Sequence, residues 1–308
     1  MELGKLKKPN LFIIGNQKSG TTALYHFLRA HPDIFFPEIK EPFYFAQDLL
    51  KERKEKGMEI PHYSQKEGYE KLYKKAGNKE VIGDASTVYL FSEVAAENIY
   101  EFNKDAKIVL ILREIVDYLS SLHAQNTISN GEDKDFETAL NLEDSRRKGE
   151  NLPKFYNYKS YFYYSEWTKY AEHIKRYLDL FPKENIKILF YEDFKNDNNG
   201  VVKEILDFLD INTSFVPEVR EYNQTMNIKF QKLKFFVENN FSFVKTCMPY
   251  FIHNLLSKAF LKLVSGKKGK PKVDEELRKK LMKKYKCEVV KLGKLIDKDV
   301  VKKWGYEK

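Results

Sequence analysis

The chain has 308 residues, with 54 lysines and arginines against 45 aspartates and glutamates, so its formal net charge is +9. Apolar residues make up 42% and charged residues 32% of the chain, a balance that excludes a disordered tail and a membrane protein. The positive charge favours an anionic partner such as phosphate, sulfate, nucleic acid or an acidic membrane face. Lysines that only solvate the surface would give the same count.

The N-terminal segment and the cysteines indicate a compartment. The apolar run at residues 11–14 is too short for a signal-peptide core or a membrane span. Two cysteines, Cys247 and Cys287, are too few for a disulfide framework, which fits a reducing environment. We therefore expect a cytoplasmic protein without a transmembrane segment.

Short apolar runs alternate with helical patterns over the first two thirds of the chain. Buried strands are predicted at residues 11–14, 81–82, 108–112 and 186–191. Helical spacing follows at residues 21–30, 92–102, 116–128 and 201–209, and a long amphipathic helix is predicted over residues 161–181. Alternating strands and helices predict an α/β fold, with a central parallel sheet flanked by helices.

The pattern changes to helices alone from about residue 231. Residues 235–264 are rich in aromatic and aliphatic side chains, and a basic turn follows at residues 266–271. A charged amphipathic helix is predicted over residues 274–292, with Asp274 as its N-cap. We expect one domain over residues 1–308, with an α/β nucleotide-binding core at 1–230 and a helical region at 231–308.

A glycine-bracketed loop is the strongest functional signal. The strand at residues 11–14 leads into GNQKSGTT at residues 15–22, and a helix follows, so backbone N–H groups would face an anion. The spacing of Gly15 and Gly20 fits the nucleotide-triphosphate loop GxxxxGK[ST], but Thr21 replaces its lysine and Lys18 lies inside the loop. Arg113, rather than a magnesium-binding aspartate, follows the strand at 108–112. We predict a P-loop-like phosphate site without the metal-dependent parts; an ordinary glycine turn is the alternative.

Two further segments carry candidate chemistry. Arg113 lies at the carboxyl end of a predicted strand, where open α/β sheets bind ligands, and Ser121 lies two turns into the next helix. A guanidinium and a hydroxyl there could bind a phosphate. Lys40 and Glu41 precede Pro42, which stiffens the turn, and a held carboxylate can act as a general base. Each segment alone could equally provide ordinary surface charges.

Together the three segments resemble sulfotransferases that use 3′-phosphoadenosine 5′-phosphosulfate (PAPS), above all the heparan-sulfate and bacterial carbohydrate type. The loop QKSGTT at residues 17–22, the Lys40-Glu41-Pro42 segment and the Arg113–Ser121 spacing carry the resemblance. A basic turn and a tryptophan near the C-terminus, Trp304, add to it. The resemblance implies that the nucleotide contacts Gln17, Lys18, Ser19, Gly20, Thr21, Thr22, Arg113, Ser121, Lys267, Lys268, Gly269 and Lys270.

Two positions depart from the family pattern. Glu114 stands where the family usually has asparagine, so a negative charge lies beside the expected 3′-phosphate site. Tyr118 stands where an arginine is common. The basic turn at residues 266–271 could compensate.

The resemblance also implies catalytic roles. Glu41 would take the proton of the acceptor, Lys18 would stabilise charge on the leaving oxygen, and Lys40 would lie near the sulfuryl oxygens. His123 is the alternative base, although a helix-face role is expected for it. Acceptor contacts are proposed, with buried structural roles as the alternative, for Asp84, Ser86, Tyr89 and His123.

The implied function is transfer of a sulfuryl group from PAPS to a hydroxyl or amine, with adenosine 3′,5′-bisphosphate as product. The expected acceptor is a glycan, with a lipid, sterol or phenol as alternatives. The six histidines lack a ligand spacing such as HExxH, so we expect no metal. The rival functions are a nucleotide-triphosphate hydrolase or kinase, which would need magnesium, and a nucleic-acid binder, which would need a stripe of positive charge. The positive charges are dispersed, so no nucleic-acid partner is expected.

Overall fold

The computed structural model describes residues 8–154, 156–215 and 273–307. The chain divides into two compact units. The first comprises residues 1–118, 165–223 and 278–308, and the second comprises residues 119–164 and 224–277. The expected boundary at residue 230, the apolar stretch 235–264 and the basic turn 266–271 lie outside the described residues.

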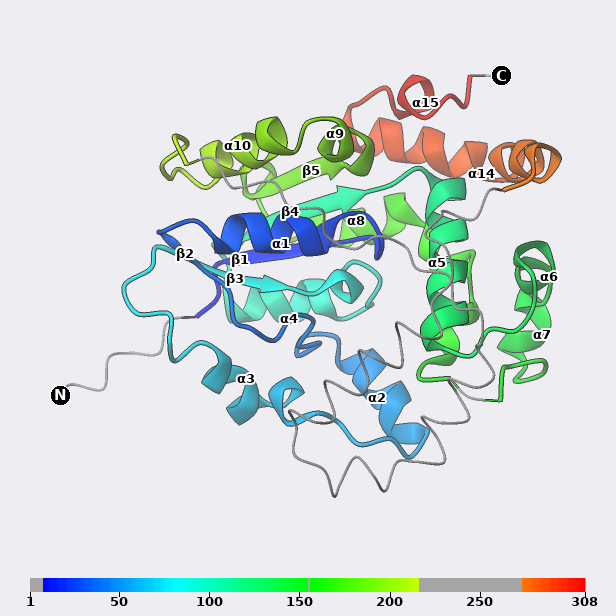
Figure 1. Ribbon diagram of the computed structural model, residues 1–308, viewed down its shortest axis with the longest axis horizontal. Helices are drawn as coiled ribbons and strands as arrows, with labels where there is room; N and C mark the ends of the chain where they lie inside the picture. The colour runs from blue at the N-terminus through cyan, green and yellow to red at the C-terminus, as the bar shows by residue number, and fades with distance from the viewer. Residues whose placement is uncertain (1–7, 155, 216–272, 308) are drawn as a thin grey trace, which may run out of the picture. The chain divides into compact units, whose positions relative to one another are not determined.

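A parallel sheet of five strands forms the centre of the first unit (Figure 1). The strands are β1 (Leu11–Gly15), β2 (Ile34–Phe35), β3 (Val81–Ala85), β4 (Lys107–Leu112) and β5 (Ile186–Phe190), in the order β2-β3-β1-β4-β5. Every pairing is parallel. The predicted α/β fold is confirmed, and only the short strand β2 was not expected.

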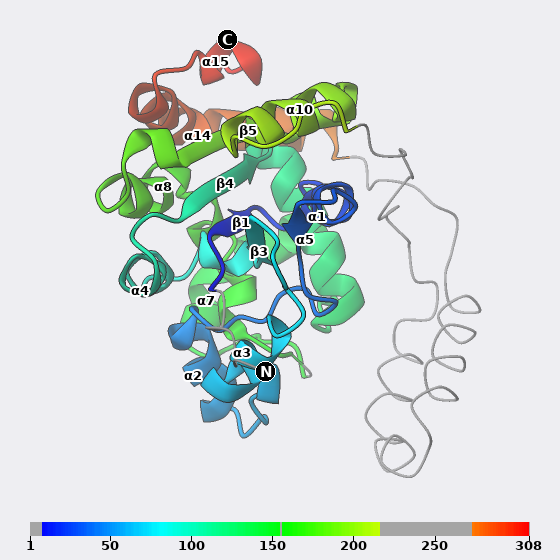
Figure 2. The same ribbon diagram turned by 90° about the vertical axis from the view of Figure 1, so that its left-hand side faces the viewer.

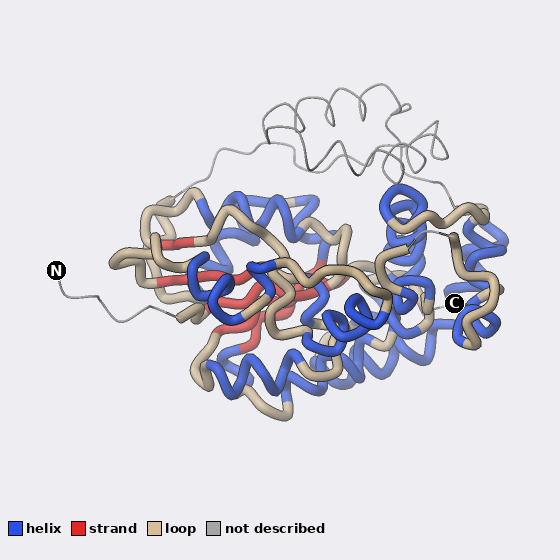
Figure 3. Tube along the Cα trace, turned by 90° about the horizontal axis from the view of Figure 1, so that it is seen from below, coloured by secondary structure: helices blue, strands red, loops and turns tan. Residues whose placement is uncertain are grey.

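Helices cover both faces of this sheet. Figure 2 shows α1 (Thr21–Arg29) and α10 (Asn198–Phe208) on the side opposite α4 (Ala95–Phe102) and α8 (Tyr170–Leu178), and Figure 3 shows the strands between helices. Strands buried on both faces need apolar side chains at successive positions. This explains why the central strands read as continuous apolar runs, with β1 and β4 almost wholly buried.

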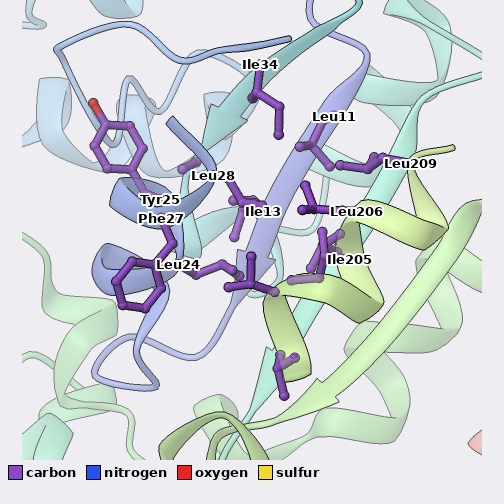
Figure 4. Packing of buried hydrophobic residues seen from close by; sticks show 14 of the residues in the cluster. Leu11, Ile13, Leu24, Tyr25, Phe27, Leu28, Ile34, Ile205, Leu206 and Leu209 are labelled. Atoms are coloured by element: carbon purple, nitrogen blue, oxygen red, sulfur yellow. The ribbon is translucent and has the colours of Figure 1, made fainter. Parts of the chain in front are cut away.

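The core between the sheet, α1 and α10 positions the start of α1 (Figure 4). Leu24 and Leu28, four residues apart on α1, lie on one helix face and are fully buried against β1. Ile205 and Leu206 contribute the facing surface of α10. Burial of each such side chain contributes about 1.5–3 kcal/mol, so the helix that follows the glycine loop is firmly anchored.

The long helix predicted over residues 161–181 is wrong in its first half. The structure has two 3₁₀ turns, Lys159–Phe162 and Glu166–Thr168, before α8 begins at Tyr170. Phe162 and Tyr164 are both fully buried, and Tyr161 is 8% exposed, so the aromatic side chains do not lie on one helix stripe. The spacing of the aromatic residues matched that of an amphipathic helix. In the structure they are buried because they occupy turns whose side chains point in several directions.

The structure describes eight further α-helices. They are α2 (Gln47–Glu55), α3 (Lys66–Leu72), α5 (Ile115–Ser129), α6 (Phe136–Asn141), α7 (Glu143–Arg147), α9 (Tyr191–Asn196), α14 (Glu275–Ile296) and α15 (Val300–Lys303). Asp274 accepts hydrogen bonds from the backbone N–H groups of Glu276 and Leu277, which confirms it as the N-cap of α14. Among the helices of residues 8–154, 156–215 and 273–307, none is long and apolar enough to cross a bilayer.

Candidate active site

The candidate site lies at the point where the sheet connections diverge. The chain leaves β1 towards the β2 edge of the sheet, whereas it leaves β4 towards β5 at the opposite edge. Ligands of open α/β sheets bind outside the carboxyl ends of strands at such a switch point. The glycine loop follows β1 and Arg113 follows β4, so the structure brings these two predicted features to adjacent strand ends.

Tight packing explains the glycines at both ends of the loop. A Cβ atom on Gly15 would lie 2.4 Å from the carbonyl oxygen of Ile111 in the adjacent strand, closer than any side chain allows. Gly20 has φ +85°, and a Cβ atom there would lie 2.9 Å from the Phe194 ring of α9. The loop is therefore shaped by close backbone approach to its neighbours.

The helix after the loop begins without a side-chain cap. Gly20 is the N-cap residue of α1, and no acidic residue lies in the first turn. The Ser19 hydroxyl is fully buried in this turn and has no hydrogen-bond partner. Uncapped N–H groups and a buried unpaired hydroxyl are features that an anionic ligand could satisfy, so the anion site expected at this loop stays a prediction.

Two cations adjoin this helix start. The Lys18 ammonium has no ion-pair partner among the described residues, and its backbone is left-handed at φ 62°. Arg113 donates from Nη1 to the Lys18 carbonyl oxygen at 2.8 Å, its guanidinium lies 4.8 Å from the Tyr191 ring centre, and its buried Nε has no partner. Burial, and then the Arg113 charge, lower the pKa of Lys18. In the described structure, no carboxylate forms an ion pair with Lys18 or Arg113. Their positive charge is therefore suited to an anionic ligand.

Glu41 is tied to the carboxyl end of β3, the strand on the other side of β1. Its backbone is left-handed at φ 61°, and its N–H donates to the Ala85 carbonyl oxygen at 3.1 Å. The side chain accepts from Lys40 and from the backbone N–H of Thr87, the latter at 2.8 Å. Sequence reasoning did not identify Thr87, because no local pattern links it to Glu41.

Asp84, Ser86 and Tyr89 bond to one another inside the first unit. The Asp84 carboxylate is 1% exposed and accepts hydrogen bonds from Tyr69 at 2.8 Å, Ser86 at 2.8 Å and Tyr89 at 3.0 Å. Burial raises the pKa of Asp84 to about 6, although all three hydrogen bonds favour the carboxylate. These contacts fit the buried structural role that the sequence analysis gave as the alternative for these residues. Acceptor binding by them stays a prediction.

Glu114 has a structural role that the sequence did not reveal. Its carboxylate accepts hydrogen bonds at 2.9 Å from the backbone N–H groups of Val116 and Asp117, and so caps the start of α5. It also accepts from Arg278 at 3.2 Å and from Tyr306. The departure from the family pattern is therefore a carboxylate held by four hydrogen-bond donors.

The remaining predicted residues lie in the second unit or beyond the described residues. Ser121 is buried on the part of α5 that belongs to the second unit. His123 Nε2 lies 2.9 Å from the Lys134 carbonyl oxygen, and burial lowers the pKa of its imidazole. Lys267, Lys268, Gly269 and Lys270 lie outside the described residues, as does any contact they make. Within the described ranges, no three His, Cys, Asp or Glu side chains gather as a metal site.

Comparison with known proteins identifies the family. The chain is 24% identical over 311 residues to the membrane-associated sulfotransferase kil1 of Dictyostelium discoideum, covering 75% of this chain and 64% of the relative. It is 23% identical over 230 residues to heparan sulfate glucosamine 3-O-sulfotransferase 3A1 of Mus musculus, covering 73% and 51%. The chain thus spans between about half and two thirds of the length of these curated relatives.

A solved structure agrees over nearly the whole chain. The crystal structure of a sulfotransferase from Alicyclobacillus acidocaldarius superimposes with a TM-score of 0.72 at 27% identity, covering 97% of this chain and 99% of that one. The model of the sulfotransferase domain family matches residues 8–296, a range that contains the glycine loop, Glu41 and Arg113. The chain belongs to the sulfotransferase domain family.

Proposed function

We propose that this protein transfers a sulfuryl group from PAPS to a hydroxyl or amine of an acceptor and releases adenosine 3′,5′-bisphosphate. The observation that carries the proposal is the anion site after β1. It combines the uncapped start of α1, the unpaired Ser19 hydroxyl and the unneutralised Lys18–Arg113 pair. These groups fit a nucleotide that carries negative charge at two positions.

Different residues of this chain would bind the two ends of that nucleotide. The amides of residues 17–22 and the Ser19 hydroxyl would hold the 5′ phosphosulfate end, as the resemblance implies. Arg113 would hold the 3′-phosphate, and the resemblance assigns Ser121 and residues 267–270 to the same phosphate. The Nε of Arg113 is buried and has no hydrogen-bond partner, so this donor would be satisfied if the guanidinium turned towards a bound phosphate.

The bound nucleotide supplies an activated sulfuryl group, and the chemistry left to the protein is proton removal and charge stabilisation. Glu41 would accept the proton of the attacking hydroxyl. Its side chain remains 26% exposed, so an acceptor can reach it. Lys18 would stabilise the negative charge that develops on the 5′-phosphate oxygen, and Lys40 would lie near the sulfuryl oxygens. No step in this scheme requires a metal.

The acceptor we propose is a glycan. Carbohydrate sulfotransferase 15 and heparan sulfate glucosamine 3-O-sulfotransferase 3A1, both from Mus musculus, match 66% and 73% of this chain at 24% and 23% identity. Their names favour a sugar hydroxyl or amine over a sterol or phenol. A lipid-linked sugar belongs to the same chemical class.

The test is sulfuryl transfer from labelled PAPS to a panel of glycans, sterols and phenols, together with two variants. Glu41→Gln should abolish turnover while leaving the affinity for adenosine 3′,5′-bisphosphate unchanged, because the amide cannot accept the proton. Lys18→Ala should lower kcat by about 10²–10³-fold, the usual effect of removing one stabilising group from a developing oxyanion.

Three outcomes would contradict the proposal. Near-normal turnover by Glu41→Gln would make the base assignment wrong and would transfer the role to His123, for which His123→Gln is the direct check. Unchanged kcat in Lys18→Ala would contradict the leaving-group role. Magnesium-dependent ATP hydrolysis without any PAPS turnover would favour the rival nucleotide-triphosphate hydrolase.

A further inference from the structure

The carboxylate of Glu41 is held mainly by one residue that lies far along the chain. The backbone N–H of Thr87 donates to Oε2 at 2.8 Å. The Thr87 hydroxyl lies 3.2 Å from both Oε1 and Oε2, so it bridges the two carboxylate oxygens. Lys40, adjacent in sequence, provides the other contact through Oε1.

The backbone of Glu41 is tied to the same strand end. Its N–H donates to the Ala85 carbonyl oxygen, two residues before Thr87. A left-handed conformation is unfavourable for a residue with a long side chain, so the attachments at both ends of Glu41 must offset its cost. Main chain and carboxylate are therefore aligned by a single short segment, residues 85–87.

That segment is itself rigid. Thr87 is 4% exposed and begins a 3₁₀ turn, Thr87–Tyr89. The preceding Ser86 donates its backbone N–H to the Ile13 carbonyl oxygen of β1 and its hydroxyl to Asp84. Thr87 therefore occupies a fixed place beside the strand that leads into the phosphate loop.

We propose that Thr87 is a positioning residue, which fixes the orientation in which the Glu41 carboxylate meets the acceptor proton. This inference rests on the proposed role of Glu41 as the base. The hydroxyl, which bridges both oxygens, restricts rotation of the carboxylate, and the N–H anchors Oε2. A misaligned base lowers the rate of proton transfer without changing the binding of the nucleotide.

The test replaces the hydroxyl while preserving the shape of the side chain. Thr87→Val removes the bridging hydroxyl, and we expect kcat to fall about tenfold, in keeping with the loss of one hydrogen bond to a charged group. The KM for PAPS and the affinity for adenosine 3′,5′-bisphosphate should stay unchanged. Thr87→Ser restores the hydroxyl and should return kcat to within about twofold of the original enzyme.

A double-variant comparison separates positioning from a general effect. Glu41→Asp keeps a carboxylate but shortens the side chain by one methylene, which withdraws it from Thr87. In that background Thr87→Val should cost less than about twofold, because residues that act through one another are not additive. A full tenfold loss in both backgrounds would overturn the proposal, as would unchanged kcat in Thr87→Val alone.

The remaining outcomes also decide the matter. If Thr87→Val and Thr87→Ala both lower the melting temperature and the nucleotide affinity, Thr87 supports the fold rather than the carboxylate, and the proposal is wrong. If Glu41→Gln is inactive while Thr87→Val is normal, only this inference fails. If Glu41→Gln is fully active, the proposed base fails first and the inference falls with it.

Discussion

Lys18 and Glu41, the two residues with the central chemical roles in the proposal, both have left-handed backbones at φ 62° and 61°. Such conformations are rare for residues with long side chains, and they persist where the surroundings impose them. For Lys18 the imposing contact is Arg113 on its carbonyl oxygen, and for Glu41 it is the Ala85 carbonyl oxygen on its N–H. At the residue scale, both residues with a proposed chemical role therefore have a backbone conformation that tertiary contacts hold in place.

Asp84 provides a prediction at this scale. Burial raises its pKa from an ordinary value of 3.8 to about 6, so the folded protein binds this proton more tightly than the unfolded chain does. The contribution of Asp84 to stability is therefore greater at low pH and is lost as the pH rises through about 6. Relative to Asp84→Asn, the free energy of unfolding should increase by about 2 kcal/mol between pH 7 and pH 4.

Urea denaturation of both proteins at several pH values checks this expectation. The asparagine variant keeps the shape of the side chain and removes only the titration, so all other acid-sensitive groups cancel in the comparison. Parallel stability curves from pH 7 to pH 4 would contradict the assigned pKa. The hydrogen bonds from Tyr69, Ser86 and Tyr89 would then outweigh burial.

At the element scale, the C-terminal helix α14 secures the start of α5. Arg278 in the first turn of α14 bonds Glu114 at 3.2 Å and also bonds Asp117. Tyr306, near the end of the chain, bonds the same Glu114, and Trp304 donates to Glu192 at 3.2 Å. Residues near the C-terminus of the chain thus stabilise the start of α5 and helix α9.

Arg278→Met should weaken this attachment. The Glu114 side chain is 8% exposed and would lose a charged partner, whereas Arg278 itself is 35% exposed, which reduces the effect. We expect a loss of about 1–2 kcal/mol in the free energy of unfolding, measured by urea denaturation. The matched control is Lys279→Met on the exposed neighbour, which should change stability by less than about 0.5 kcal/mol. Equal effects of the two substitutions would show that the ion pairs contribute nothing specific.

At the scale of the whole molecule, the net charge of +9 gives only a general preference for anions. The structure shows which cations are placed to use it. Lys18 and Arg113 lie unneutralised at the switch point, whereas Lys40, Lys107 and Arg278 form ion pairs with Glu41, Asp210 and Glu114. We therefore expect specific anion binding at Lys18 and Arg113, which lie beside the start of α1 and have no acidic partner in the described structure.

Adenosine 3′,5′-bisphosphate should stabilise the protein measurably. At roughly a hundredfold excess over Kd, a ligand that binds only the folded state contributes about 2.7 kcal/mol, which raises Tm by several degrees. Adenosine 5′-monophosphate, which lacks the 3′-phosphate, should give a smaller shift at the same concentration. Differential scanning fluorimetry measures both shifts, and higher salt should reduce them. Equal shifts with the two nucleotides would mean that no group of this chain recognises the 3′-phosphate.

The sequence by itself determined the structural features that depend only on residues close together in the chain. The strand–loop–helix at residues 11–30, the apolar runs of β4 and β5 and the N-cap Asp274 all follow from local patterns of apolar, glycine and capping residues. The same local reading failed for residues 161–181, because consecutive buried aromatics imitate a helical stripe without forming one. It singled out the glycine loop and Glu41 as candidates, but it did not show which contacts hold either of them.

Only the tertiary structure decided the contacts between distant segments. Thr87 lies 46 residues from Glu41, and Arg278 lies 164 residues from Glu114, so no spacing in the chain could reveal these pairs. The strand order β2-β3-β1-β4-β5 brings the three relevant strand ends together. The order is a property of packing, because it depends on which crossover buries which apolar face. The sequence thus identified the candidate groups, and the tertiary structure showed the partners that hold Lys18, Glu41 and Arg113 in place.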